Sequence, residues 1–141
     1  MTSLTLARSY LVKATKRLKI LDVLLGEEAY SDVVREAQEI VELAQKAMLR
    51  HRGIDPPKWH DVGPILLEHA DRFTDLHPDQ LARLARISRW LRKERELSFY
   101  GDIDFLPTEA YSLDDAQRAM ADARFTVAIA SGLIPSPPCA S

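Results

Sequence analysis

The chain has 141 residues and a mass of 15.9 kDa, which is the size of one ordinary domain. Hydrophobic residues make up 46% of the chain and charged residues 28%, a composition that excludes a largely disordered protein. The single cysteine, Cys139, excludes an internal disulfide framework and a zinc site built from cysteines. No run of about 18 apolar residues occurs, so no membrane-spanning helix is expected. The N-terminal region lacks the apolar core of a signal peptide, and the expected location is the cytoplasm.

The net charge of -2 argues against a general polyanion binder, but the charges are unevenly distributed. No acid precedes Asp22, and acids then gather in residues 27–42 and 102–122. A basic block follows the middle of the chain: Arg83, Arg86, Arg89, Arg92, Lys93 and Arg95. Two interpretations stay open, a helical bundle held by salt bridges and a basic face for a partner that carries phosphate.

Apolar residues spaced three and four apart predict two helices in the first third of the chain. The first covers residues 4–25, with Thr2 or Ser3 as its N-cap and Gly26 at its end. The second begins at Glu27 or Ser31 and runs to residue 51, with Gly53 as its C-terminal stop. Adjacent prolines at 56 and 57 then predict a loop, because proline cannot continue a helix.

Three more helices follow. A short one is predicted after Asp61 as N-cap, with Pro64 in its first turn. A long one starts at Pro78 and reaches about residue 99, and a last one runs from the N-cap Ser112 to Gly132. No strand pattern and no repeat is found. The predicted fold is therefore all-α, an antiparallel up-and-down bundle of four main helices plus a shorter one over residues 1–133, with residues 134–141 as a flexible proline-rich tail.

The fourth predicted helix interrupts its own apolar face. Its inward side carries Leu81, Leu84, Ala85 and Leu91, yet Ser88 and Arg95 fall near the centre of that side and Arg92 at its edge. A buried guanidinium needs a partner, and two arginines three residues apart share one side of a helix. Together they suit a phosphate or carboxylate. The alternative is that Arg95 reaches solvent at the end of the bundle or pairs with an internal acid such as Glu36.

A polar ridge marks the second helix. Gln38, Glu42 and Lys46 are four residues apart and lie opposite its apolar face. The ridge is interpreted either as a self-association surface or wall of a cleft, or as an ordinary solvent face.

Several motifs in a fixed order resemble the HEPN family (higher eukaryotes and prokaryotes nucleotide-binding). They are Gln38-x3-Glu42-x3-Lys46-x2-Leu49, Gly53, His60-Asp61-Val62, Arg92-x2-Arg95, Phe99-Tyr100-Gly101-Asp102 and Tyr111-Ser112. The resemblance spans residues 4–130 and is closest to the stand-alone prokaryotic type. It implies a homodimeric four-helix bundle that commonly pairs with a minimal nucleotidyltransferase in toxin–antitoxin-like systems. It also implies, for many members, metal-independent ribonuclease activity from an Arg-x4–6-His motif.

The sequence departs from that motif, because no histidine stands four to six residues after Arg92. Arg72 and His77 satisfy the spacing formally and are the catalytic candidates, although about one chance match is expected and His77 before Pro78 also suits a cap. His60 beside Asp61 suits phosphate binding or a local loop hydrogen bond. No metal-ligand spacing and no glycine-rich phosphate loop occurs, so no metal or cofactor is predicted.

Three hypotheses follow. In the first, the protein is a homodimer that binds nucleotide or RNA, with Arg92 and Arg95 on phosphate, Tyr100 stacking on a base, Asp102 accepting a hydrogen bond and His60 near the phosphate. In the second, it is a metal-independent ribonuclease. In the third, it is a non-enzymatic module that binds a partner protein such as the nucleotidyltransferase.

Overall fold

The computed structural model is an all-α bundle, as the sequence predicts. It describes residues 2–58, 61–99, 106 and 110–135, with the backbone alone for residues 95–99. The helices are α1 (Ser3–Gly26), α2 (Tyr30–His51), α3 (Gly63–Glu68), the 3-10 turn η1 (Ala70–Arg72), α4 (Pro78–Phe99) and α6 (Leu113–Leu133). No strand occurs in these ranges. None of the described helices is long and apolar enough to cross a membrane.

The ends of α1, α2 and α6 follow the predicted capping chemistry. The Thr2 side chain accepts a hydrogen bond from the backbone N–H of Thr5 at 3.1 Å, and Ser112 forms a reciprocal capping box with Asp115. Gly53 follows α2 with φ of 75°, a conformation that glycine adopts at little cost. The start of α3 differs from the prediction, because the helix begins at Gly63 and its N-cap is Val62 instead of Asp61. The Asp61 side chain accepts from the N–H of Gly63 at 3.1 Å, one residue earlier than a capping side chain would stand.

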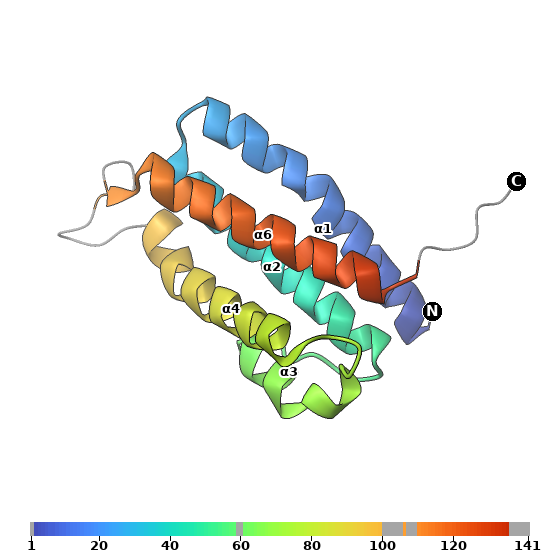
Figure 1. The fold of residues 1–141 in the computed structure, drawn as a ribbon. Coiled ribbons are helices and arrows are strands. Elements are labelled where there is room, and N and C mark those ends of the chain that lie inside the picture. The colour runs from blue at the N-terminus through green and yellow to red at the C-terminus, as the bar shows by residue number, and fades with distance from the viewer. Residues whose placement is uncertain (1, 59–60, 100–105, 107–109, 136–141) are drawn as a thin grey trace, which may run out of the picture.

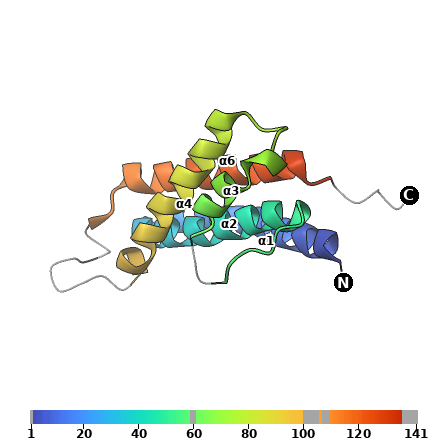
Figure 2. The same cartoon turned by 90° about the horizontal axis from the view of Figure 1, so that it is seen from below.

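Helix α2 is the centre of the bundle. It packs against α1, α4 and α6, and α1 also contacts α6 (Figure 1). Helix α4 is inclined to the other three long helices, and α3 packs against it (Figure 2). Helix α4 therefore contacts α2, α3 and α6.

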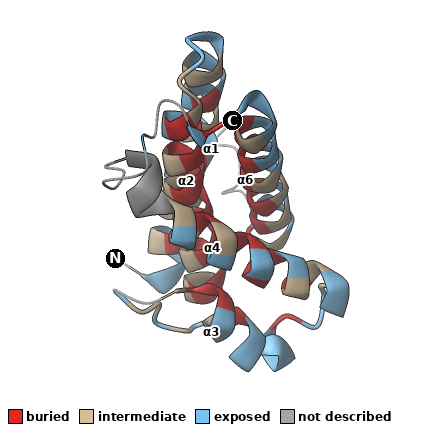
Figure 3. Ribbon diagram, turned by 90° about the vertical axis from the view of Figure 1, so that its left-hand side faces the viewer, coloured by how far each residue is buried: buried red, intermediate tan, exposed pale blue. Residues whose placement is uncertain are grey.

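The core follows the predicted apolar positions (Figure 3). Ala7, Ala14 and Leu21 of α1 are seven residues apart and fully buried, and the small side chains of the two alanines allow α1 to lie close to α2. All six predicted apolar positions of α6 are buried: Ala116, Ala119, Met120, Ala123, Val127 and Ala130. Removing this surface from water supplies most of the stabilisation of the bundle.

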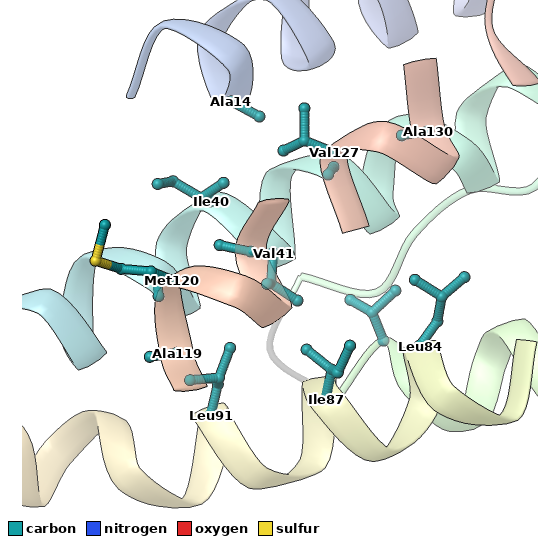
Figure 4. Packing of buried hydrophobic residues seen from close by; sticks show 14 of the residues in the cluster. Ala14, Ile40, Val41, Leu84, Ile87, Leu91, Ala119, Met120, Val127 and Ala130 are labelled. Carbon is teal, nitrogen blue, oxygen red and sulfur yellow. The ribbon is translucent and has the colours of Figure 1, made fainter. Parts of the chain in front are cut away.

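The inward side of α4 is also as predicted, with one addition. Leu81, Leu84, Ala85 and Leu91 are buried, and so is Ser88. Ile87, which the sequence analysis did not place in the core, is only 4% exposed. Figure 4 shows Leu84, Ile87 and Leu91 directed from α4 toward α2 and α6.

Two buried polar contacts connect the helices. The Arg17 guanidinium of α1 donates to both carboxylate oxygens of Glu36 on α2, at 2.7 and 3.3 Å, and this bond raises the pKa of Arg17. Glu36, offered above as a partner for Arg95, is therefore engaged by α1. Gln45 of α2 is fully buried and donates from Nε2 to the carbonyl of Leu84 on α4 at 2.9 Å.

The first two residues of the predicted tail lie against the bundle. Ile134 is 2% exposed, and Arg8 of α1 donates from Nε to the carbonyl of Pro135 at 3.1 Å. Residues 136–141, including Cys139, lie outside the described residues.

Candidate functional site on helix α4

Helix α4 carries a run of five cations that no acid interrupts, from Arg83 to Lys93. No acid occurs between Asp79 and Glu94, a stretch that contains most of the basic block. Arg83, Arg86, Arg89 and Lys93 are exposed, and Arg92 is half-buried. Helical periodicity distributes these cations over more than one side of α4. The helix therefore presents guanidiniums both toward the α3 region and toward α6.

The predicted pair Arg92 and Arg95 lies on the side of α4 that continues from Ser88. The structure shows the Arg92 side chain half-buried and the backbone of residue 95 helical, so the pair shares that side of the helix. The Arg95 side chain is outside the description. The other predicted ligands of this site, Tyr100, Asp102 and His60, also lie outside the described residues.

One turn before Arg92, a polar contact joins α4 to the start of α3. Ser88 Oγ donates to Asp61 Oδ1, the same oxygen that accepts from the N–H of Gly63. Asp61 therefore has a positioning contact that its sequence motif did not reveal. It holds residue 61 against the side of α4 on which Ser88 lies.

The predicted ridge of α2 is a connected polar row. Gln38 Nε2 donates to Glu42 Oε2 at 3.1 Å, and Lys46 Nζ lies 3.0 Å from Glu42 Oε1. Gln38 is only 4% exposed, and the side chains of Glu42 and Lys46 are 18% and 19% exposed. The ridge is therefore not an open solvent face. Gln45, two turns after Gln38, bonds to α4, so this side of α2 borders α4.

A buried acceptor remains on that ridge. Gln38 Oε1 has no hydrogen-bond partner, and leaving a buried amide oxygen unsatisfied is costly. A donor from water, from a ligand or from a second protein would remove that cost. This is the observation that keeps the ridge a candidate surface.

The two formal catalytic candidates make separate contacts. Arg72 donates from Nη1 to the carbonyl of Arg52 at 2.9 Å, and Arg52 returns a bond to the carbonyl of Arg72 at 2.6 Å. The 68% exposed His77 side chain accepts from the N–H of Asp79 through Nδ1 at 3.1 Å, which caps the start of α4. Arg72 therefore connects η1 to the end of α2. His77 caps the start of α4, which is the alternative given for it in the sequence analysis.

A pocket between α4 and α6 was not anticipated from the sequence. It has a volume of about 230 Å³ and is lined by Arg83, Arg86, Ile87, Arg118 and Asp122. Two arginines beside it stack on rings of the opposite helix: the Arg83 guanidinium carbon is 3.7 Å from the ring centre of Phe125, and that of Arg118 is 3.9 Å from the ring centre of Trp90. The antiparallel arrangement of α4 and α6 makes these two pairs reciprocal.

The acid of this pocket is poorly compensated. The Asp122 side chain is 14% exposed, and its Oδ2 lies 4.0 Å from Arg118 Nε. Burial raises the pKa of Asp122, against the lowering effect of Arg118 and Arg83. The charged form of Asp122 is thus less stable in the folded protein than in water.

This shift predicts the sign of a pH effect. Because the pKa of Asp122 is higher in the folded state, its contribution to stability is most favourable at low pH and declines as pH rises past the ordinary aspartate pKa. We expect Asp122→Asn to unfold at higher urea than the wild type at pH 7, by less than about 1 kcal/mol, and to lose that advantage near pH 3. An Asp122→Asn variant less stable than the wild type at pH 7 would contradict this assignment.

A hydrogen bond also connects α4 to the residues that precede α6. Tyr111 donates from Oη to Glu94 Oε2 at 2.7 Å, joining the end of α4 to the start of α6. Burial and this hydrogen bond raise the pKa of Tyr111. The described residues contain no group of three or more histidine, cysteine, aspartate and glutamate side chains that could hold a metal ion.

Fold and surface together define an all-α bundle in which α4 carries an uninterrupted run of cations. A family model described as HEPN domain matches residues 7–133, nearly the whole chain, and the chain belongs to the HEPN family. HEPN domains are helical modules related to nucleotides and RNA. A search of curated proteins finds no match for this chain.

Proposed function

We propose that this HEPN domain binds the phosphate groups of a nucleotide or RNA through α4. Arg92 and Arg95 hold phosphate, Tyr100 stacks on a base, Asp102 accepts a hydrogen bond and His60 adjoins the phosphate. The observation that carries the proposal is the half-buried Arg92 within a helix that bears no acid from residue 80 to residue 93. The five cations between residues 83 and 93 make this stretch of α4 positive, which favours an external anion.

The chemistry of arginine suits this ligand. Its planar guanidinium carries five N–H donors in a fork that matches phosphate oxygens, and partial burial strengthens each charge-assisted bond. RNA binding of this kind depends strongly on phosphate contacts and therefore on salt. Because the net charge of the chain is -2, the residues outside this run are acidic on balance, which favours α4 as the place where RNA binds.

We further propose that the protein acts as a homodimer in the cytoplasm, with a minimal nucleotidyltransferase as partner in a toxin–antitoxin-like system. The ridge of Gln38, Glu42 and Lys46 supports a self-association surface, because the buried Gln38 Oε1 has no hydrogen-bond partner. The exposed acids Glu27, Glu28 and Asp32 around the α1–α2 turn suit a basic face on the partner protein.

The test of phosphate binding is the affinity for a labelled single-stranded RNA, measured by fluorescence anisotropy. We expect Arg92→Ala to weaken binding at least tenfold, or about 1.4 kcal/mol. The matched control is Arg124→Ala, which removes the same charge from α6, where Arg124 pairs with Asp22 of α1 at 2.8 Å. Arg92→Ala and Arg124→Ala binding RNA equally well, with unchanged melting temperatures, would contradict the proposal.

The ribonuclease alternative is tested with the same RNA. Arg72 and His77 each make a contact that serves the fold, which favours binding without cleavage. We expect the RNA to remain intact on a gel after incubation with excess protein in EDTA. Cleavage that His77→Ala abolishes would instead assign the ribonuclease activity to this pair.

A further inference from the structure

We propose that the pocket between α4 and α6 is a second anion site that binds a phosphomonoester dianion. This goes beyond the proposed function, because it lies on a different side of α4. Arg83 and Arg92 are two and a half turns apart, so helical periodicity puts them on opposite sides of the helix. The pocket is formed with α6, and the Arg92 side continues from Ser88 toward α3.

The fold holds two of the three pocket guanidiniums in place without using their hydrogen-bond donors. Arg83 lies over the ring of Phe125 and Arg118 over the ring of Trp90. Stacking engages the face of a guanidinium, whereas its N–H groups lie in the plane and point outward. Both rings pack against the core, so the arginines rest on fixed supports. Less side-chain entropy is then lost when a ligand binds.

The charge in the pocket is unbalanced toward an anion. Arg83, Arg86 and Arg118 supply three positive charges, and Asp122 is the acid that lines the pocket. Arg118 Nε is 4.0 Å from Asp122 Oδ2, too far for a hydrogen bond, so this acid does not occupy the guanidinium donors. In the described part of the chain, the guanidiniums of Arg83 and Arg86 donate to no carboxylate.

The remaining properties select the kind of anion. A net charge of two positive units matches a phosphomonoester, whose second pKa is about 6 and which is a dianion above pH 7, better than a singly charged phosphodiester. The volume of about 230 Å³ is several times the roughly 30 Å³ share of one water, so a tetrahedral anion fits with some hydration. Ile87 lines the pocket as its apolar wall and strengthens the electrostatic attraction.

The experiment is a titration of the intact protein with inorganic phosphate at pH 7.5, followed through the NMR amide signals of Ile87 and Asp122. We expect saturable shifts of these signals. Arg86→Ala should weaken the affinity about tenfold, because it removes one charged donor from an exposed position. Asp122→Asn should strengthen it severalfold, because it removes the opposing negative charge. Arg89→Ala, an equal loss of charge at an exposed position of α4 that does not line the pocket, should change it less than twofold.

Opposite signs for Arg86→Ala and Asp122→Asn distinguish a binding site from a merely structural cluster. Shifts that do not saturate, or the same affinity in Arg86→Ala and Arg89→Ala, would overturn the inference. Competition by a short RNA with a 5′-monophosphate, but not by the same RNA without it, would identify a terminal phosphate as the source. Binding of inorganic phosphate without such competition would identify the free ion.

The two proposals fail in distinguishable ways. Arg92→Ala should leave the phosphate titration of Ile87 and Asp122 unchanged while RNA binding falls. Normal RNA binding with no saturable response in the pocket overturns this inference and leaves the proposed function standing. Saturable phosphate binding in the pocket of a protein that does not bind RNA overturns the proposed function and leaves this inference standing.

Discussion

Arg17→Ala is expected to destabilise the folded protein by about 3 kcal/mol. Its guanidinium holds both oxygens of Glu36, whose side chain is 8% exposed, and the Arg17 side chain itself is 30% exposed. Removing one partner of a buried ion pair leaves the other charge buried without compensation, at a cost of about 3–5 kcal/mol. The partial exposure of Arg17 places the expected loss at the lower end of that range. Urea denaturation measures it directly.

The neighbouring Lys16 provides the control for this prediction. Lys16→Ala removes the same charge from an exposed position of α1 and should change the free energy of unfolding by less than about 0.5 kcal/mol. Adding Glu36→Gln to Arg17→Ala should restore part of the lost stability, because the uncompensated carboxylate is then absent. Equal effects of Arg17→Ala and Lys16→Ala would mean that the pair does not hold α1 to α2.

Gly63→Ala is the second large effect, expected to destabilise the protein by about 1–3 kcal/mol. A Cβ at residue 63 would lie 2.9 Å from the carbonyl oxygen and 3.0 Å from the Cα of Ala85, and 3.3 Å from the Cβ of Ser88. The first two neighbours are backbone atoms of α4 and cannot rotate away. The start of α3 must then move off α4, which also disturbs the bond between Ser88 and Asp61. Thermal unfolding of the variant measures the loss.

Gly132→Ala is the matched control, since a Cβ there meets nothing within 4 Å and the residue lies in the last turn of α6. Alanine is favoured over glycine in a helix, so this variant should be as stable as the wild type or more stable by up to about 0.5–1 kcal/mol. A Gly63→Ala protein that melts with the wild type would refute the close approach of α3 and α4.

Local sequence signals predicted most of the fold because they act within one helix. Thr2 and Ser112 have side chains that cap a helix start, Gly53 suits a positive φ, and Pro78 suits a first turn. The apolar seam of α1 and the alanine-rich face of α6 have the period of a helix, and both are buried as predicted.

Contacts between helices were not predictable in the same way. Gln38 is polar, so the sequence allowed an exposed ridge at this position. In the structure, α2 contacts three long helices and Gln38 is buried. Glu36 was considered for Arg95, and only the packing of α1 on α2 shows that Arg17 holds it. A periodic pattern states which side of a helix is apolar but not which distant helix covers it.

The candidate site was predicted in part for the same reason. The arginines of α4 are visible as a run in the sequence, and the structure places Arg92 half-buried. The pocket with Asp122 depends on Arg83 meeting Phe125 and Arg118 meeting Trp90, pairs that are far apart in the chain. One signal was present: Ile87 and Trp90 are apolar residues outside the predicted inward face of α4, which indicates a second packing side.

Mapping the amide signals of the protein during an RNA titration tests most directly whether RNA phosphate binds this HEPN domain on α4. We expect saturable shifts that concentrate on α4 between residues 83 and 95 and weaken as salt rises. Shifts concentrated on α1, whose Lys13, Lys16 and Lys19 are exposed and serve as an internal comparison, would contradict it. So would a titration in which no signal of α4 responds.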